Sequence, residues 1–317
     1  MRIGRREALA LLGLTAVGCG RDSMSPSKDP GDDPLNALSP AGQVPDVVRV
    51  GITPSLGPDT HERLVPLFDY LGRRLGRPVE GLTADSYDDL AERVRDHAIH
   101  LGVFSPASYV KARKGMAAVA IATATSSGSP TYVGYLVVRG DAAAGHGGPH
   151  PPHPPLLGDL AGKRIAWVSK SSTSGYLYPR LMLRHKGIDP DTFFSEQIFA
   201  EDHEAAIEAV GEGRVDVAAA GSPFVDPESA TRVERERPLV VVAKTARIPF
   251  DCLVVHRDLE QQLAKDLRAA VLNLPKSDDD ADRRTRQELE ASWGLDGFVA
   301  PMHAAYDEVE TALGEPA

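Results

Sequence analysis

Hydrophobic and polar positions along the chain follow two periods, one of two residues and one of about 3.6, which predicts strands alternating with helices. Residues 47–52 form an apolar run of strand length, and the apolar positions of 61–75 lie on one helical face that ends at Gly76. The same succession continues along the chain. Further strands are predicted at 99–104, 116–125, 132–139, 163–169, 195–200, 215–220, 239–243 and 250–256, and further helices at 86–97, 107–113, 173–186, 202–211, 260–273 and 280–293.

The elements fall into two blocks of similar rhythm, which predicts an α/β protein with parallel sheets covered by helices on both faces. Residues 248–317 follow the second block and are expected to pack back on the first. The prediction is therefore a two-lobe clamshell with a ligand cleft at the hinge. Lobe 1 is formed by 46–140 plus 248–317, and lobe 2 by 159–247.

A stretch rich in Gly, Pro and His, residues 141–158, separates the two blocks. It is predicted to be a solvent-exposed insertion, partly in the polyproline II conformation. His146, His150 and His153 lie in it, but no fixed geometry or carboxylate partner holds them. A solvated loop is therefore preferred to a metal site.

The N-terminus has the form of an export signal, in which arginines precede an apolar run of ten residues. A helix of that length spans ~15 Å, about half of the hydrocarbon core of a bilayer, so residues 1–18 are interpreted as a cleaved signal peptide. The small residues before Cys19 resemble the lipobox of bacterial lipoproteins, although Ala16 replaces a larger aliphatic residue. The resemblance implies a lipid on Cys19, and an ordinary cleaved signal is the alternative. Residues 19–45, rich in Asp, Pro, Ser and Gly, are predicted to be a flexible tether.

Charge and cysteine content narrow the possible partners. Asp and Glu number 45 against 35 Lys and Arg, which gives a formal net charge of -10. An acidic surface repels phosphate backbones and no basic patch stands out, so nucleic-acid binding is not expected. Beyond Cys19 there is a single cysteine, Cys252, in a predicted strand, so a buried thiol is expected in place of a disulfide.

The most informative motif is a run of four hydroxyl residues that ends in Ser172, Thr173 and Ser174 and is followed by Gly175. It follows a predicted strand and opens a predicted helix. Hydroxyl and backbone N–H groups at a helix start converge where the helix dipole is positive, and so form an anion site. Gly175 would let a ligand approach the backbone. A plain helix cap is the alternative, but four hydroxyls exceed what a cap needs.

Together with motifs elsewhere in the chain, this run resembles the phosphate/phosphite/phosphonate-binding proteins of ABC importers, the PhnD-type family. The resemblance covers about 46–315. The matching segments are VGITP at 50–54, FDYL at 68–71 with LG at 75–76, FSPASY at 104–109, STSGY at 172–176, HEAA at 203–206, IP at 248–249 and GFV at 297–299.

The resemblance implies a type II periplasmic binding fold with the ligand held between the lobes. It places a phosphorus oxyanion at Ser172, Thr173 and Ser174. It further implies that Tyr109 and His203 complete the cage, the first through its O–H group and the second through a ring N–H group.

Further positions bear on the identity of the ligand. Ser105 stands where relatives commonly have Gly, so its hydroxyl is a candidate contact, and Ser55 in the first loop is another. Relatives that take aminoethylphosphonate use acidic residues for the ammonium group, and one such position here is Gly221. This departure favours phosphite, a small alkylphosphonate or phosphate. The expected site has no Lys or Arg, so affinity must come from many short hydrogen bonds in a closed cleft.

Enzymatic interpretations have less support. Residues 108–111 match S-x-x-K, but the accompanying motifs of penicillin-recognising enzymes are missing. His203-Glu204 lacks the second histidine of H-E-x-x-H, and there is no nucleotide-binding glycine loop. We therefore expect no catalysis, no cofactor and no metal.

The sequence predicts a monomeric, extracytoplasmic binding protein, lipid-anchored to a membrane of the cell envelope. It would capture a small phosphorus oxyanion (phosphite, phosphonate or phosphate) between its lobes and deliver it to an ABC permease. Two alternatives remain open: a sensory binding protein that reports to a receptor kinase, and the same fold with another small anion.

Overall fold

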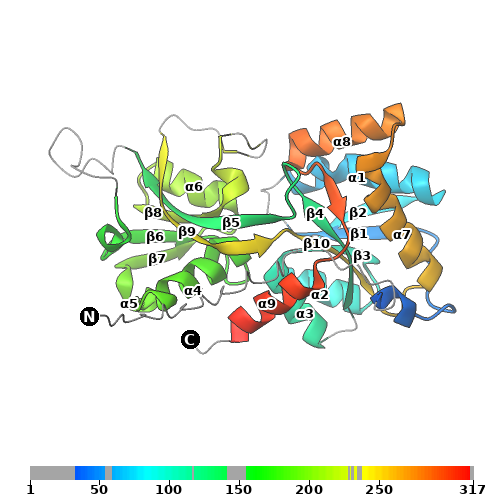
Figure 1. Ribbon diagram of the computed structural model, residues 1–317, viewed down its shortest axis with the longest axis horizontal. Coiled ribbons are helices and arrows are strands. Elements are labelled where there is room, and N and C mark those ends of the chain that lie inside the picture. The colour runs from blue at the N-terminus through cyan, green and yellow to red at the C-terminus, as the bar shows by residue number, and fades with distance from the viewer. Residues whose placement is uncertain are drawn as a thin grey trace, which may run out of the picture.

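The computed structural model describes residues 33–53, 59–115, 118–140, 155–227, 229, 232–233 and 238–314. They contain a six-stranded and a five-stranded sheet, each with helices on both faces. The sheets form two lobes that lie side by side along the long axis of the molecule (Figure 1). The predicted two-lobe α/β architecture is confirmed.

Lobe 1 contains the six-stranded sheet, in the order β11-β4-β10-β3-β1-β2. Its strands are β1 (Val48–Ile52), β2 (Val79–Thr83), β3 (Leu101–Phe104), β4 (Ala118–Thr125), β10 (Cys252–His256) and β11 (Gly297–Val299). Its helices are α1 (Thr60–Leu75), α2 (Tyr87–Arg95), α3 (Pro106–Gly115), α7 (Gln261–Asn273), α8 (Asp280–Trp293) and α9 (His303–Gly314), with 3-10 turns at Pro34–Ala37 and Leu274–Lys276. The helices α1, α7 and α8 cover one face of the sheet, and α2, α3 and α9 the other (Figure 1).

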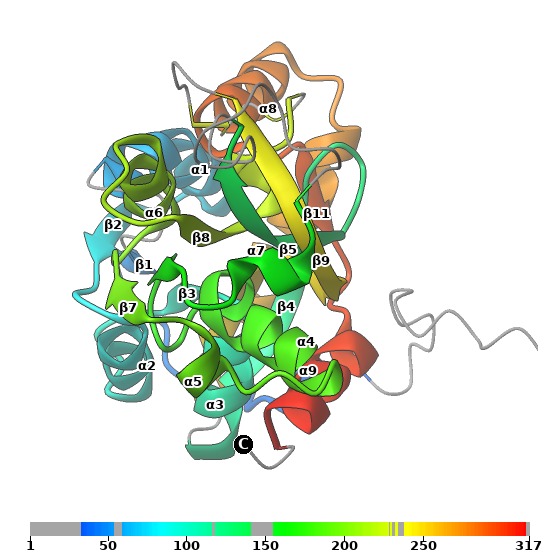
Figure 2. The same ribbon diagram turned by 90° about the vertical axis from the view of Figure 1, so that its left-hand side faces the viewer.

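Lobe 2 contains the five-stranded sheet, in the order β7-β6-β8-β5-β9. Its strands are β5 (Thr131–Arg139), β6 (Arg164–Trp167), β7 (Glu196–Phe199), β8 (Val217–Gly221) and β9 (Leu239–Pro249). Its helices are α4 (Tyr178–His185), α5 (Pro190–Phe193) and α6 (His203–Gly211), with 3-10 turns at Leu157–Leu160 and Ser222–Phe224 and a π-helical turn at Thr173–Leu177. Figure 2, seen from the lobe 2 end, shows α6 on one side of the strands and α4 with α5 on the other.

Three helix boundaries lie at the residues where the sequence predicted them. The hydroxyl of Ser86 accepts a hydrogen bond from the Asp89 N–H group at 3.1 Å and so caps α2. The carboxylate of Asp202 accepts one from the Ala205 N–H group at 2.7 Å and caps α6. Helix α1 ends at Gly76, whose φ of 64° is readily adopted by glycine.

The lobe boundary lies earlier than the sequence predicted. Strand β5 was expected in lobe 1, as part of 46–140, but it pairs antiparallel with β8 and β9 and belongs to the sheet of lobe 2. The chain therefore crosses between lobes at 126–130 and again at 250–251. Both crossings join strands directly, without a helix, and the strands they join run antiparallel to their neighbours. For this reason both sheets are mixed and not wholly parallel.

The part of the expected tether that the structure describes, 33–45, is packed on lobe 1 and is not free chain. The side chains of Leu35 and Leu38 are buried in the core of lobe 1. Arg268 of α7 donates a hydrogen bond to Asp33 at 2.7 Å. The prediction failed because the polar composition concealed two apolar anchor residues. Residues 1–32, with the expected signal and Cys19, lie outside the described residues, as do 141–154 of the expected insertion.

Two smaller points concern membranes and thiols. No helix in the described part of the chain combines the length and the apolar character that crossing a bilayer requires. Cys252 is a buried free thiol at the start of β10, as its apolar context predicted.

Candidate ligand-binding site

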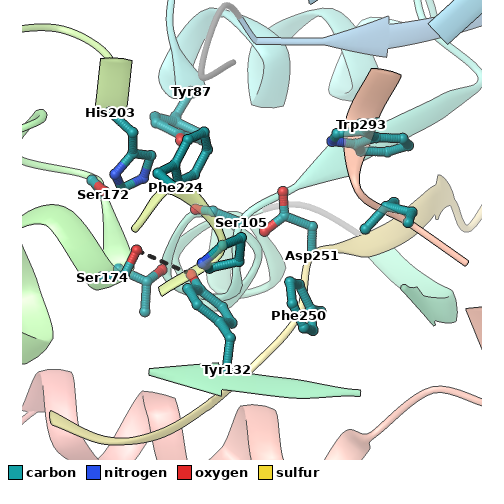
Figure 3. Close-up of a pocket in the computed structure, with 13 residues that line it drawn as sticks. Tyr87, Ser105, Tyr132, Ser172, Ser174, His203, Phe224, Phe250, Asp251 and Trp293 are labelled. Carbon is teal, nitrogen blue, oxygen red and sulfur yellow. Dashed lines mark hydrogen bonds between the residues drawn. The ribbon is translucent and has the colours of Figure 1, made fainter. Parts of the chain in front are cut away.

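A cavity lies between the lobes, at the ends of strands from both sheets. It has a volume of about 60 Å³. Lobe 1 contributes residues that follow β3 and α8, lobe 2 contributes residues that follow β6 and β8, and the second crossing closes one side (Figure 3). The lining residues are Tyr87, Ser105, Tyr132, Ser172, Thr173, Ser174, His203, Pro223, Phe224, Phe250, Asp251, Trp293 and Leu295.

The size of the cavity limits the ligand. A single water needs about 10–15 Å³ of such volume, so the cavity has room for roughly four to six water-sized groups. None of the described residues that line the cavity is Lys or Arg.

The hydroxyl run forms one wall of the cavity. Ser172, Thr173 and Ser174 are all buried and line the cavity together. They begin the π-helical turn, in which the Leu177 N–H group donates to the Ser172 carbonyl at 3.0 Å. Regular α-helix starts only at Tyr178, so the predicted helix 173–186 is a wide turn followed by α4. Such π turns often occur at functional sites.

The hydroxyl groups of this wall already make contacts. Ser172 Oγ accepts a hydrogen bond from the Gly175 N–H group at 3.1 Å. Thr173 Oγ1 accepts one from the Ala107 N–H group at 3.0 Å, which joins the wall to α3 of lobe 1. The Tyr132 hydroxyl donates to Ser174 Oγ at 3.3 Å. The wall is thus positioned from both lobes, and its oxygens keep further hydrogen-bonding capacity.

Ser105 lies across the cavity at the start of α3. Its Oγ accepts a hydrogen bond from the Ser108 N–H group at 3.3 Å and donates to Ser108 Oγ at 2.9 Å. The residue is buried and lines the cavity. It therefore caps α3 and at the same time lines the cavity.

His203 is held as a neutral ring with a defined tautomer. Its Nδ1 accepts a hydrogen bond from the Gly221 N–H group at 3.2 Å, so Nε2 carries the proton and can donate. The ring stacks on Phe224, with centroids 4.4 Å apart and planes at 16°. Burial lowers the pKa of His203 to about 3, which keeps the imidazole uncharged at neutral pH.

Asp251 is a cavity residue that sequence reasoning missed. Its carboxyl points into the cavity from the side opposite to His203 (Figure 3). Burial raises the pKa of Asp251 to about 7, so near neutral pH a large share of the molecules carry a carboxylic acid that can donate a hydrogen bond. The sequence did contain a signal for this residue: Asp251 is an acidic residue that stands between Pro249 and the apolar run 252–255.

Aromatic residues form the remaining walls and were also missed. Tyr132, near the start of β5, and Phe250, in the second crossing, stack with ring centroids 4.7 Å apart. Tyr87 and Trp293 come from α2 and α8 of lobe 1. These residues are distant in the sequence and share no motif, so only the fold brings them together.

Two described residues of the predicted site, Tyr109 and Gly175, are not among those that line the cavity. Tyr109 lies one turn into α3, where its ring packs edge-on against Tyr306 at 5.2 Å in the core of lobe 1. Gly175 packs on Val168, the residue after β6: a Cβ atom at position 175 would lie 2.3 Å from Val168 Cγ2, so packing requires a glycine here. Ser55 lies outside the described residues.

Comparison with known proteins identifies the family. The family model for ABC transporter phosphonate periplasmic substrate-binding proteins matches residues 50–306. The phosphate-import protein PhnD of Mycolicibacterium smegmatis is 29% identical over 171 residues, which are 51% of this chain and 50% of that protein. The phosphonates-binding periplasmic protein of Escherichia coli is 25% identical over 201 residues, 62% of this chain and 56% of that one. The chain thus spans about half the length of the curated relatives it matches.

A solved structure confirms the fold. PhnD1 from Prochlorococcus marinus, in complex with methylphosphonate, superposes with a TM-score of 0.69 at 20% identity and covers 85% of this chain and 97% of that one. The family model spans most of the chain, agrees with the resemblance seen in its motifs, and describes binding proteins and not enzymes. The chain belongs to the phosphonate family of periplasmic substrate-binding proteins of ABC transporters.

Proposed function

We propose that this protein captures a small phosphorus oxyanion (phosphite, a small phosphonate or phosphate) between its lobes and delivers it to an ABC permease. The observation that carries the proposal is that the hydroxyl wall Ser172–Ser174 lines one small cavity together with the neutral donor His203 and the acid Asp251. Relatives named for phosphate import and for phosphonate binding support the ligand class.

The proposed recognition rests on neutral donors. Hydroxyl groups, the Nε2–H group of His203 and the protonated form of Asp251 would each donate to a ligand oxygen. Hydrogen bonds to a charged group contribute about 1.5–3 kcal/mol each, so a few of them suffice without a cationic side chain. In a closed cavity each unmatched donor is costly, which favours an anion with several tetrahedrally arranged oxygens.

The surroundings of Gly221 favour a ligand without an amino group. A Cβ atom at this position would lie 3.1 Å from Ser174 Oγ and 3.2 Å from Tyr132 Cε2, so the wall has no room for an acidic side chain unless its neighbours shift. The small cavity, with a volume of about 60 Å³, is compatible with a compact ligand such as phosphite, methylphosphonate or phosphate.

We further propose that the protein works outside the cytoplasm as a lipid-anchored monomer. The family is periplasmic, which supports an extracytoplasmic location. The lipobox-like residues before Cys19 support the anchor. Mass spectrometry of the membrane fraction would test it: an acylated Cys19 at the new N-terminus is expected, and a soluble chain cleaved elsewhere would contradict it.

Calorimetry with five anions tests the function. Phosphite, methylphosphonate, phosphate, aminoethylphosphonate and sulfate would be titrated into the protein and into the Ser172→Ala variant. We expect one of the first three to bind tightest, and Ser172→Ala to weaken it by about 2 kcal/mol. Ser195→Ala, an exposed serine of lobe 2, is the matched control and should bind like the parent.

Three results would contradict the proposal. If none of the five anions binds, the cavity is not a phosphorus oxyanion site. If sulfate binds as tightly as the best phosphorus compound, the site is a general anion site. If any compound is turned over, the protein is an enzyme.

A further inference from the structure

Three metal-ligating side chains gather at the end of the lobe 1 sheet that lies opposite the cavity. His97 lies in the turn between α2 and β3, His256 is the last residue of β10, and Asp258 lies in the turn before α7. Strands β3 and β10 run antiparallel, with Leu101 opposite Val255, so the turn before β3 and the turn after β10 meet at one edge. The cavity residue Asp251 precedes the other end of β10.

Two of the distances within this cluster are close to those of a coordination shell. Asp258 Oδ2 lies 3.7 Å from His97 Nε2 and 3.6 Å from His256 Nδ1, and all three ligand atoms lie within 4.8 Å of one another. Both nitrogen–oxygen separations are too long for a hydrogen bond. A zinc ion binds imidazole nitrogen and carboxylate oxygen at about 2.0–2.2 Å, so tetrahedral ligands lie about 3.3–3.6 Å apart. The two nitrogen–oxygen separations match this spacing within a few tenths of an ångström.

The ring of His256 has a defined tautomer. Its Nδ1 accepts a hydrogen bond from the Asp258 N–H group at 3.1 Å, so this nitrogen is the unprotonated one, and an ion that binds to it replaces this hydrogen bond. His97 has a φ of 58°, and its ring meets that of His256 edge-on at 4.4 Å. The exposed fractions of the side chains of His97, His256 and Asp258 are 30%, 12% and 64%, so an ion from solvent can reach them.

We propose that His97, His256 and Asp258 bind a divalent transition-metal ion of the zinc type, with water completing its coordination. Two imidazoles and one carboxylate suit Zn²⁺ and its neighbours in the first transition series, whereas Ca²⁺ and Mg²⁺ prefer oxygen ligands throughout. An ion at this position joins the α2–β3 turn to the β10–α7 turn. The Asp258 carbonyl also accepts a hydrogen bond from the Gln43 N–H group at 2.7 Å, so the ion would stabilise the attachment of the N-terminal segment.

Zinc titration of the full chain tests this site. The histidine-rich insertion could bind zinc independently, so His146, His150 and His153 are first replaced by Ser in a background variant. After chelator treatment, Zn²⁺ is titrated in competition with a chromophoric chelator. We expect one equivalent to bind to the background variant, and His97→Asn or Asp258→Asn to weaken it at least ten-fold. Asn tolerates the left-handed backbone at position 97, and Asp258→Asn preserves shape. His185→Asn, an exposed histidine of α4, is the control.

Thermal unfolding supplies a second readout. Zn²⁺ should raise the Tm of the background variant, because it binds only the folded chain, and the increase should vanish in the two site variants. Their Tm without metal shows that they fold. The proposal is overturned if the background variant binds no stoichiometric zinc, or if the site variants bind zinc as tightly as the background does.

Discussion

Arg63 of α1 and Glu204 of α6 form an ion pair between the two lobes, with Arg63 Nη2 2.9 Å from Glu204 Oε1. The side chains are 23% and 30% exposed, so the pair is partly shielded from water. Glu204 follows the cavity residue His203 directly. Because its partners belong to different lobes, the ion pair stabilises only the closed arrangement of the lobes and not an open one.

Breaking this pair should weaken ligand binding. Arg63→Ala and Glu204→Gln each remove up to about 1 kcal/mol from the closed form, which is roughly a five-fold loss of affinity. The double variant Arg63→Glu/Glu204→Arg should recover most of it. Calorimetry with the best ligand at low and high salt provides the measurement. Arg214→Ala, which breaks an exposed pair with Glu212 inside lobe 2, should have no effect. Unchanged affinity in both single variants would refute a role in closure.

The carboxyl of Asp251 should make ligand affinity depend on pH. Its pKa of about 7 means that it becomes a carboxylate as the pH rises above 7, and the negative charge then repels an anion. Asp251→Asn keeps a donor without the charge. We expect the ratio of parent to variant affinity to fall by up to about ten-fold per unit above pH 7. The ligand titrates identically in both experiments, so the ratio isolates Asp251. A ratio constant from pH 6 to 8.5 would contradict this role.

The same residue should also affect stability. The folded state binds the Asp251 proton more tightly than the unfolded state, whose carboxyl has its ordinary pKa of 3.8. The contribution of the Asp251 carboxyl to the free energy of unfolding is therefore complete below about pH 4 and is lost as the pH rises through about 7. Urea denaturation of parent and Asp251→Asn without ligand should show the variant gaining relative stability between pH 5 and 8. A parallel pH dependence of the two proteins would show that the pKa is not raised.

Two substitutions by phenylalanine distinguish a residue that acts in the cavity from one that packs in the core. His203→Phe keeps the stacking on Phe224 but removes both the Nε2–H donor and the Nδ1 acceptor of the Gly221 N–H group, so we expect a ten- to hundred-fold loss of affinity, equivalent to about 1.5–3 kcal/mol. Tyr109→Phe should bind ligand like the parent, because Tyr109 packs in the core of lobe 1. Calorimetry decides both. A large loss in Tyr109→Phe would mean that this hydroxyl reaches the ligand after all.

Glycine 175 should be essential for stability. In Gly175→Ala the new Cβ atom would lie 2.3 Å from Val168 Cγ2 and 2.6 Å from Val168 Cβ, so β6 or the π turn must shift at a cost of about 1–3 kcal/mol. Chemical denaturation provides the measurement. Gly211→Ala in α6 is the matched control: its Cβ atom meets nothing within 4 Å, so it should be neutral or slightly stabilising. Equal stability of the two variants would show that the turn relaxes freely.

The features that could be predicted from the sequence are those that depend on residues adjacent in the chain. Ser172, Thr173 and Ser174 are consecutive and follow a clear strand, so their convergence on one place could be inferred from local structure. His203 was identified through the family resemblance, and its position at the start of the helix that Asp202 caps agrees with that expectation. The two lobes followed from the repeated rhythm of strands and helices.

Residues positioned by the crossings could not be predicted in this way. Tyr132 and Asp251 enter the cavity because the chain changes sheets beside them, and the position of a crossing depends on long-range pairing that periodicity does not reveal. Tyr109 illustrates a different failure: family resemblance indicated a tyrosine near the site, but the direction of its side chain depends on packing against Tyr306.

The N-terminal segment on lobe 1 has a mechanical consequence. Residues 33–45 are held by buried Leu35 and by the pairing of Gln43 with the α7 turn, so tension applied from upstream acts on this lobe first. Lobe 2 is covalently joined to lobe 1 only through the two crossings, so that tension does not act on it directly. Such an arrangement lets lobe 2 move relative to lobe 1, while lobe 1 keeps a constant orientation toward any anchor that holds the N-terminal segment.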